Sequence, residues 1–466
     1  MEGGEPARLS LLQLSVQSVS AVMGQLHERN GRSSFIAEEA FQVDFHFSDR
    51  FAAESGEGGT PASMMLRHAP FLIPFQDRLQ VFDAFLAQDK RSVPGLQQTS
   101  SGLMFHPVGH QITVNRSQVF EDGFRTLHRL GGKLKGAIKV SYINSQGLAE
   151  AGIDGGGLFK DFMMNLCKDA FDPQRGLFKA TDDGKLYPNP ASHLAADAHL
   201  EYFEFLGMVL GKAVYDGILV ELPLARFFVS KLKGRSSGLK DLESLDAELY
   251  QNLLFLKQYE GSVEDLSLFF SLDTDQYGEA KETELIPGGK DVPVTNENVL
   301  RYIHLVAHHR LNLQIRPQSY AFLRGFQTLV DSAWTSMFNE DELQELIAGK
   351  EGPINVTDMK SNVIYSGGYT EDHETIKCFW EVVEDMSPDD QRELLQFTTS
   401  CSRPPLQGFR HLNPHFCIHK AGEAEQRLPT ASTCMNLLKL PAYASSSILR
   451  DKLLYSIRSG AGFEMS

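Results

Sequence analysis

The feature that most limits how this chain can fold is a break near residue 350. The segment LIAGKEGPINV, residues 346–356, places Gly349, Gly352 and Pro353 between a helical pattern and a new segment. Glycine reaches backbone conformations that other residues avoid, and proline fixes φ, so such a run interrupts regular structure. We therefore expect a hinge here between two parts that fold around separate cores.

Helical patterns dominate the chain before this break. Apolar residues recur at helical spacing in residues 8–29 and again in FLIPFQDRLQVFDAFLAQDK, residues 71–90. Between them, the small and turn-rich stretch AAESGEGGTPAS, residues 52–63, predicts a flexible loop. Residues 136–143 alternate as a strand does, and helical patterns then run from about 158 to 345.

Helices and short strands are mixed after the break. Residues 372–386 have a helical pattern, and a second helix is predicted to follow Ser387, with that serine as N-cap and Pro388 at the first helical position. The segments HFCIHK and TCMNLLKL predict short strands, and the last helical pattern stops near Gly460. The part beyond residue 353 is therefore expected to contain both kinds of element.

The composition argues against several classes of protein. A formal net charge of −16 disfavours nucleic-acid binding, which needs a basic face. No run of about 18 apolar residues is present, so we expect no membrane span. The cysteines are scattered and form no CxxC pair, which is typical of reduced thiols in the cytosol or nucleus. They are Cys167, Cys378, Cys401, Cys417 and Cys434.

Two patterns suggest sites but have structural explanations. The glycine cluster GIDGGGLFKDF, residues 152–162, fits neither phosphate-binding fingerprint, so a turn that positions a helix is the better interpretation. His415, Cys417 and His419 alternate and would face one way on a strand, as zinc ligands can. No fourth ligand has characteristic spacing, and a half-buried strand edge explains the alternation equally well. We expect neither a metal nor a cofactor.

Cys434 lies in RLPTASTCMNLLKLP, residues 427–441, between small polar residues and an apolar run. It lacks the signatures of cysteine phosphatases, papain-like proteases and caspases. Thioester exchange needs less activation than peptide hydrolysis, because a free thiol of pKa about 8.5 is already a few per cent thiolate at neutral pH. A cysteine without an adjacent histidine therefore suits transthiolation. Residue chemistry alone leaves this role open beside that of a buried structural thiol.

The segment around Cys434 resembles the active-site signature of HECT-type ubiquitin ligases, with Leu-Pro, Thr-Cys, then Asn, Leu and Leu-Pro. Other segments are similar to landmarks of that domain, in the same order, from about residue 111 to 466. They are AGIDGGGLFKDF, LYPNP, YFEFLGMVLGKAVYDGILVELPLARFF, PVTNEN, FTTSCSRPPLQGF and the closing GF. Residues 71–90 also resemble the stretch ahead of the domain in a branch of proteasome-associated ligases.

The resemblance implies an α+β fold with two lobes. Residues 111–348 would form a larger, mainly helical N-lobe that binds a ubiquitin-conjugating enzyme. Residues 354–466 would form a smaller α/β C-lobe that carries the cysteine, and residues 349–353 would be the hinge. Residues 1–110 would be a helical extension with the flexible loop near 52–63.

By the same resemblance, Cys434 would take ubiquitin as a glycyl thioester, with Thr433 beside it, and pass it to substrate lysines. HECT tails place an aromatic anchor four residues from the end, which is Phe463 here. Transfer is the harder step, since a lysine amine of pKa about 10.4 must lose a proton before it attacks. Glu464 and the Ser466 carboxylate are the groups expected to assist.

Two positions depart from the pattern of many relatives. Ser432 stands where a histidine is common two residues before the cysteine, so a histidine there cannot be the base. Arg175 stands where some relatives have an aromatic residue that helps to hold a second ubiquitin, whereas Tyr277 keeps the other aromatic of that exosite.

The resemblance also places a groove for the conjugating enzyme in LYQNLLFL, VEDLSL and RYIHLV. Its residues would be Leu249, Leu253, Leu256, Leu266, Leu268, Tyr302 and Val306. Tyr302 is the expected anchor, because aromatic residues often dominate such contacts. A place in the core is the alternative for each of the others.

The expected partners are a ubiquitin-conjugating enzyme, ubiquitin, protein substrates and, from the branch, the proteasome. The expected outcome is polyubiquitin chains for proteasomal degradation, in the cytoplasm or nucleus. The alternative is an inactive scaffold that binds ubiquitin or the proteasome through the same fold. An intact Thr433–Cys434 pair and an intact tail favour the ligase.

Overall fold

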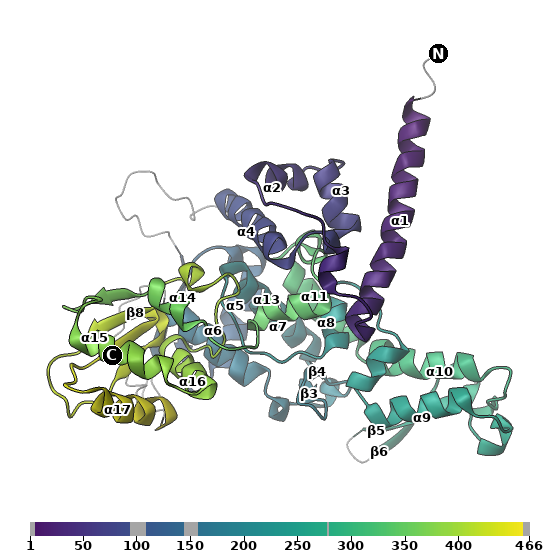
Figure 1. The fold of residues 1–466 in the computed structure, drawn as a ribbon. Coiled ribbons are helices and arrows are strands. Elements are labelled where there is room, and N and C mark those ends of the chain that lie inside the picture. Colours follow the sequence, from purple (N-terminus) through teal and green to yellow (C-terminus); the bar gives the residue numbers. More distant parts are fainter. Residues whose placement is uncertain (1–4, 94–108, 144–156, 277–278, 460–466) are drawn as a thin grey trace. The chain divides into compact units, whose positions relative to one another are not determined.

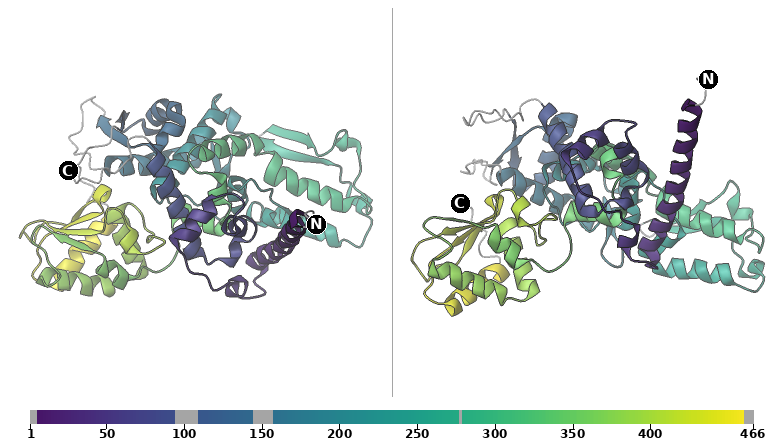
Figure 2. Two further views of the ribbon diagram at one scale, coloured as in Figure 1. Left: turned by 90° about the horizontal axis from the view of Figure 1, so that it is seen from above. Right: turned by 45° about the horizontal axis from the view of Figure 1, so that its top comes forward.

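A computed structural model describes residues 5–93, 109–143, 157–276 and 279–459, and for Cys434 it describes only the backbone (Figures 1 and 2). The chain divides into two compact units. The first contains residues 1–108, 135–137 and 330–343, and the second contains the rest. Within the described ranges, no helix combines the length and the apolar character needed to cross a membrane.

The first unit is helical. Its helices are α1 (Glu5–Ser33), α2 (Asp49–Gly56), α3 (Pro61–His68), α4 (Phe75–Ser92), α12 (Ser332–Thr335) and the first part of α13 (Glu340–Ala348). The guanidinium of Arg78 on α4 is buried, donates to a carboxylate oxygen of Glu342 at 2.7 Å and also bonds the Met337 carbonyl. Phe82 packs edge-on against Phe338 with ring centroids 5.7 Å apart. Met337 and Glu342 lie 259 and 264 residues from Arg78 in the sequence, so a distant segment completes this core.

The flexible loop predicted at residues 52–63 is wrong. These residues form the end of α2 and the start of α3, and only residues 57–60 connect the two helices. The Thr60 side chain accepts from the Ser63 amide at 3.1 Å, and Pro61 occupies the first helical turn. A cap followed by proline starts a helix, and this local signal outweighs the small, glycine-rich composition.

The helices predicted at residues 8–29 and 71–90 are confirmed as α1 and α4. The strand predicted at 136–143 is confirmed as β2 (Ile138–Ile143), which pairs in parallel with β1 (His110–Asn115).

The second unit begins with a mainly helical body. Its helices are α5 (Val119–Leu127), α6 (Gly157–Ala170), α7 (His199–Asp216), α8 (Arg226–Leu232) and α11 (Arg316–Gln327), and its second strand pair is β3 (Phe178–Ala180) with β4 (Leu186–Pro188). Helices α7 and α11 pack so closely that a Cβ added at Gly207 would lie 1.9 Å from the Phe322 carbonyl oxygen. A Cβ at Gly325 would lie 1.8 Å from the backbone carbonyl oxygen of Glu204. Glycine is therefore required at this crossing.

A smaller group of elements is inserted between α8 and α11. It comprises α9 (Ala247–Gln258), the antiparallel pair β5 (Ser271–Gln276) and β6 (Glu279–Glu284), and α10 (Val299–His308). Both views of Figure 2 show these elements together, in teal to green. We call residues 239–308 the inserted subdomain.

The last part of the second unit has its own core. The strands β7 (Ile364–Ser366), β8 (Cys417–Lys420), β9 (Thr430–Ser432) and β10 (Leu437–Leu440) form one sheet in the order β7-β8-β10-β9. The helices are α14 (Val356–Ser361), α15 (Glu374–Glu384), α16 (Pro388–Thr399) and α17 (Ser446–Ser459), and α15–α17 appear beside β8 in Figure 1. One apolar cluster, drawn from Ile354 to Ile457, fills this part. Both lobes belong to the second unit: its helical body is the N-lobe, and this last part is the C-lobe. The fold is therefore α+β with two lobes, as predicted.

Candidate active site

The backbone of Cys434 lies at a tight connection between two strands. Strands β9 and β10 are antiparallel, with Ser432 opposite Leu437, and residues 433–435 form one turn of 3₁₀ helix between them. The Thr433 carbonyl accepts from the Asn436 amide at 3.2 Å, which closes the turn. The segment predicted as one strand, TCMNLLKL, is therefore a turn followed by β10. A residue in such a turn is held at the end of the sheet.

Asn436 fixes this turn, and the sequence interpretation missed its role. It is fully buried and has a φ of 48°, a left-handed conformation that asparagine tolerates better than most residues. Its Nδ2 donates to the Pro414 carbonyl at 2.6 Å, and its own carbonyl accepts from the Cys417 amide at 2.9 Å. The turn that carries Cys434 is thereby tied to the segment before β8.

A lysine from the N-lobe also reaches this turn. Lys160 Nζ on α6 donates to Oδ1 of Asn436 at 2.8 Å. Lys160 belongs to the glycine cluster at 152–162, of which residues 152–156 lie outside the described part of the chain. The described remainder begins α6 at Gly157, which agrees with the interpretation that the cluster positions a helix.

We expect Asn436→Ala to lower the free energy of unfolding by about 2–4 kcal/mol, because it leaves buried hydrogen-bonding groups unpaired and strains the left-handed backbone. Asn436→Gly is the matched control, since it removes the same side chain but relieves the backbone. Urea unfolding of both variants measures the difference. Equal stability of Asn436→Ala and the parent chain would show that the turn does not depend on this residue.

Burial makes other cysteines poor nucleophiles. Cys167 on α6 and Cys401 are buried, and burial raises the pKa of each thiol to about 12. Burial also raises the pKa of Cys378 on α15. The Cys167 and Cys401 thiols stay protonated at neutral pH, and the thiolate is the form that attacks a thioester. Chemistry thus disfavours them as the acceptor of ubiquitin.

The alternating residues of β8 take part in structural contacts. Cys417 Sγ lies 3.4 Å from Ser366 Oγ, and the same hydroxyl lies 3.0 Å from Nδ1 of His419. His415 precedes the strand and is exposed. Among the described residues, no three histidine, cysteine or acidic side chains converge as metal ligands would.

The segment predicted as a hinge is held by a side chain of the C-lobe. Gly349 has a φ of 80°, and its carbonyl accepts from Arg403 Nη1 at 3.0 Å. The same guanidinium pairs with Glu351 at 2.6 Å. Ser402, which precedes Arg403 in the sequence, donates its backbone N–H to the Glu221 carboxylate. Motion at residues 349–353 would therefore require these contacts to break, and the hinge itself stays a prediction.

The residues predicted to form the groove all lie in or beside the inserted subdomain, but they differ in exposure. Leu253, Leu256 and Val306 are buried, and Leu249 and Leu268 are half-buried. Tyr302 is only 7% exposed and packs edge-on against Phe270, with ring centroids 5.6 Å apart. Leu266 is 37% exposed. As the structure places them, most of this set supports the subdomain from inside.

Other apolar side chains of the inserted subdomain face solvent. Phe255 on α9 is 62% exposed, Leu300 on α10 is 53% exposed, and Phe269 is 41% exposed. These residues were not singled out from the sequence. The helical spacing Tyr302–Val306 marks one face of α10, but spacing alone does not tell which face is inside.

Several predicted residues cannot be placed. Tyr277, Phe463, Glu464 and Ser466 lie outside the described residues. Arg175 does lie within them, where it pairs with Asp169 at 2.7 Å and with Glu121 at 3.0 Å. Its guanidinium carbon is 4.6 Å from the centre of the Phe120 ring. These contacts give Arg175 a structural role.

Comparison with known proteins identifies one family and several relatives. Residues 164–466 match the model of the HECT-domain (ubiquitin-transferase). The chain is 46% identical over 454 residues to the E3 ubiquitin-protein ligase UPL6 of Arabidopsis thaliana, across 96% of this chain and 43% of that protein. It is 40% identical over 495 residues to the ubiquitin-protein ligase E3B of Homo sapiens, across 99% of this chain and 46% of that protein. The chain spans less than half the length of these relatives.

Proposed function

This chain belongs to the HECT-domain (ubiquitin-transferase) family, and we propose that it accepts ubiquitin on Cys434 and transfers it to substrate lysines. The observation that carries the proposal is the place of Cys434. It lies in a turn fixed by Asn436 at the end of a sheet, within the part of the chain that matches the family model.

The chemistry needs two acyl transfers. In the first, the Cys434 thiolate attacks the thioester carbon at the ubiquitin C-terminus, a new C–S bond forms, and the cysteine of the conjugating enzyme leaves as thiolate. In the second, a substrate lysine amine attacks the same carbon, loses a proton and expels the Cys434 thiolate. The first step needs little activation, whereas the second needs a positioned base because the amine is protonated at neutral pH.

We place the docking surface for the conjugating enzyme on the inserted subdomain. Its support is the exposure of four large apolar side chains within this one subdomain, since a surface that binds another protein exposes apolar groups before the partner covers them. They are Phe255, Leu266, Phe269 and Leu300. The buried Tyr302 would shape this surface from beneath by holding Phe270.

We expect Phe255→Ala to weaken binding of the conjugating enzyme by about 1–3 kcal/mol, the range of an aromatic hot spot, with little change in melting temperature. Tyr455→Ala is the matched control, because Tyr455 is 60% exposed on α17 of the C-lobe. Calorimetric titration of both variants measures the effect. Equal affinities of the two variants would remove Phe255 from the docking surface.

The remaining expectations complete the proposal. Phe463 and Glu464 would hold and assist the transfer step, Thr433 would support the cysteine, and Tyr277 would belong to a ubiquitin exosite. The product would be polyubiquitin chains on proteins destined for the proteasome, in the cytoplasm or nucleus. Resemblance to the branch of proteasome-associated ligases supports the link to the proteasome.

A single-turnover transfer experiment tests the proposal against an inactive scaffold. A conjugating enzyme is loaded with labelled ubiquitin, further loading is stopped, and the chain is added. The label should move first to this chain, in a bond that a thiol reductant cleaves, and then to lysine. A scaffold would bind the loaded enzyme but leave the label on it.

A further inference from the structure

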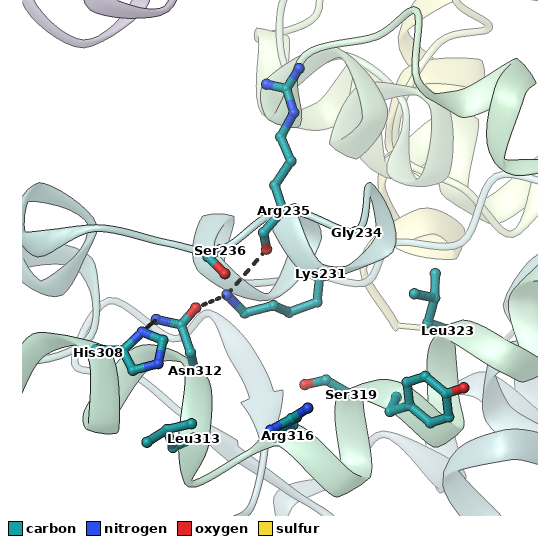
Figure 3. Close-up of a pocket in the computed structure, with 11 residues that line it drawn as sticks. Lys231, Gly234, Arg235, Ser236, His308, Asn312, Leu313, Arg316, Ser319 and Leu323 are labelled. Carbon is teal, nitrogen blue, oxygen red and sulfur yellow. Dashed lines mark hydrogen bonds between the residues drawn. The ribbon is translucent and has the colours of Figure 1, made fainter. Parts of the chain in front are cut away.

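A cavity of about 300 Å³ opens on the second unit, beside the α8–α11 region of the N-lobe (Figure 3). Lys231 at the end of α8, His308 at the end of α10 and Arg316 at the start of α11 contribute basic side chains to its wall. Among the described residues that line it, none is an aspartate or glutamate. A basic cavity is unexpected in a chain with a net charge of −16.

The amino group of Lys231 is held by neutral oxygens. It donates to Asn312 Oδ1, to Ser237 Oγ at 3.1 Å and to the Arg235 carbonyl at 3.4 Å. Burial lowers its pKa to about 8, and the field of Asp241 opposes that shift only in part. Removal of a cation from water without an anionic partner is costly, so an incoming anion would gain by pairing with it.

A serine in the same wall has an unused hydroxyl. Ser319 on α11 is 94% buried by residue area, since only 6% of it is exposed, and its Oγ makes no hydrogen bond within the described structure. Figure 3 shows Ser319 near Lys231 and Arg316 around a common space, whereas the guanidinium of Arg235 points away from it. Buried hydroxyl groups are almost always paired, so this orphan indicates an absent partner.

The cavity lies where the chain enters and leaves the inserted subdomain. Residues 234–236 lead from α8 into the subdomain, and Asn312 and Leu313 lead from α10 back to α11. The two connections are already linked, because Asn312 Nδ2 donates to the Ser237 carbonyl at 3.0 Å and its Oδ1 accepts from the Ser237 amide at 3.0 Å. An occupant would touch both connections.

We propose that this cavity binds a phosphoryl group, with Arg316 and the Ser319 hydroxyl as donors and with Lys231 turning one N–H to the anion from the Arg235 carbonyl, its longest bond at 3.4 Å. Donors on separate elements, α8 and α11, suit a tetrahedral anion that accepts from several directions. A carboxylate is planar and would leave part of this set unpaired. The phosphoryl group is either free phosphate or a phosphorylated side chain, and both share this chemistry.

The test uses the full chain with Cys434→Ala, so that the result does not depend on ligase activity. Inorganic phosphate is titrated at constant ionic strength, with chloride and acetate in parallel. Lys231→Met and Arg316→Gln should each weaken phosphate binding at least about tenfold, the loss expected for a charge-assisted hydrogen bond. Ser319→Ala should also weaken binding but leave the melting temperature unchanged, because the lost hydroxyl had no partner.

Arg235→Gln is the matched control, since it removes one charge from the same wall without removing a donor that faces the cavity. Hydrogen exchange in residues 234–236 and 309–313 should slow when phosphate is present. A phosphoserine peptide that binds more tightly than phosphate would identify a phosphorylated protein as the source, and equal affinities would identify free phosphate. Binding that is absent, equal for acetate, or unaffected by Lys231→Met and Ser319→Ala would overturn the proposal.

Discussion

Replacement of Cys434 with alanine should abolish both the reductant-sensitive ubiquitin adduct and the transfer of ubiquitin to lysine. Both acyl transfers use the same sulfur, so its loss removes the covalent route entirely. Burial raises the pKa of Cys167 and Cys401 to about 12, and these thiols cannot take over at neutral pH. We expect the rate of transfer to fall to that of the loaded conjugating enzyme alone.

Cys417→Ala is the matched control for this prediction. Cys417 lies on β8, beside the strand that follows the active-site turn, and is half-buried. The Cys417→Ala chain should transfer ubiquitin at nearly the parent rate. Loss of activity in Cys417→Ala together with retained activity in Cys434→Ala would place the reaction on Cys417 and contradict the assignment to Cys434.

Replacement of Gly325 with alanine should destabilise the N-lobe strongly. The added Cβ would lie 1.8 Å from the Glu204 carbonyl oxygen, and backbone of a packed helix cannot move away as a side chain can. Helices α7 and α11 must separate, which exposes buried apolar surface. We expect a loss of about 3 kcal/mol or more in the free energy of unfolding, at or above the upper end for overpacked cores.

The control for this variant is Gly132→Ala. A Cβ at Gly132 would meet no atom within 4 Å, and its φ is not in the left-handed region. Thermal and urea unfolding should therefore show a small change for Gly132→Ala and a large one for Gly325→Ala. Similar melting temperatures for both would mean that the crossing of α7 and α11 is looser than described.

Much of the fold could be predicted because local signals agree with the tertiary structure. The predicted cap at the start of α16 is confirmed, since Ser387 Oγ accepts from the Asp390 amide at 3.2 Å and Pro388 starts the helix. Residues 52–63 misled because glycine and serine were weighed as composition, whereas Thr60 and Pro61 act through their positions. Likewise, the glycine pair at 207 and 325 gives no local sign of the helix crossing that requires it.

The sequence predicted the part of the candidate site that is contiguous in the chain, but not the contacts that distant residues make with it. The motif located Cys434, but the bond from Lys160 to Asn436 joins residues 276 positions apart and has no signature in spacing. The docking residues show the same limit. Leucines and Tyr302 in helical patterns are equally compatible with an interior and an exterior face, and packing in three dimensions decides which face is buried.

The most direct measurement of the central claim is the chemical nature of the ubiquitin adduct on Cys434→Ser. Serine oxygen replaces sulfur, so the variant should form an oxyester that survives thiol reductant and is cleaved by alkali, while the parent adduct is lost in reductant. Mass spectrometry should place the ubiquitin C-terminus on residue 434 in both. A parent adduct that survives reductant, or one attached at another residue, would contradict the account.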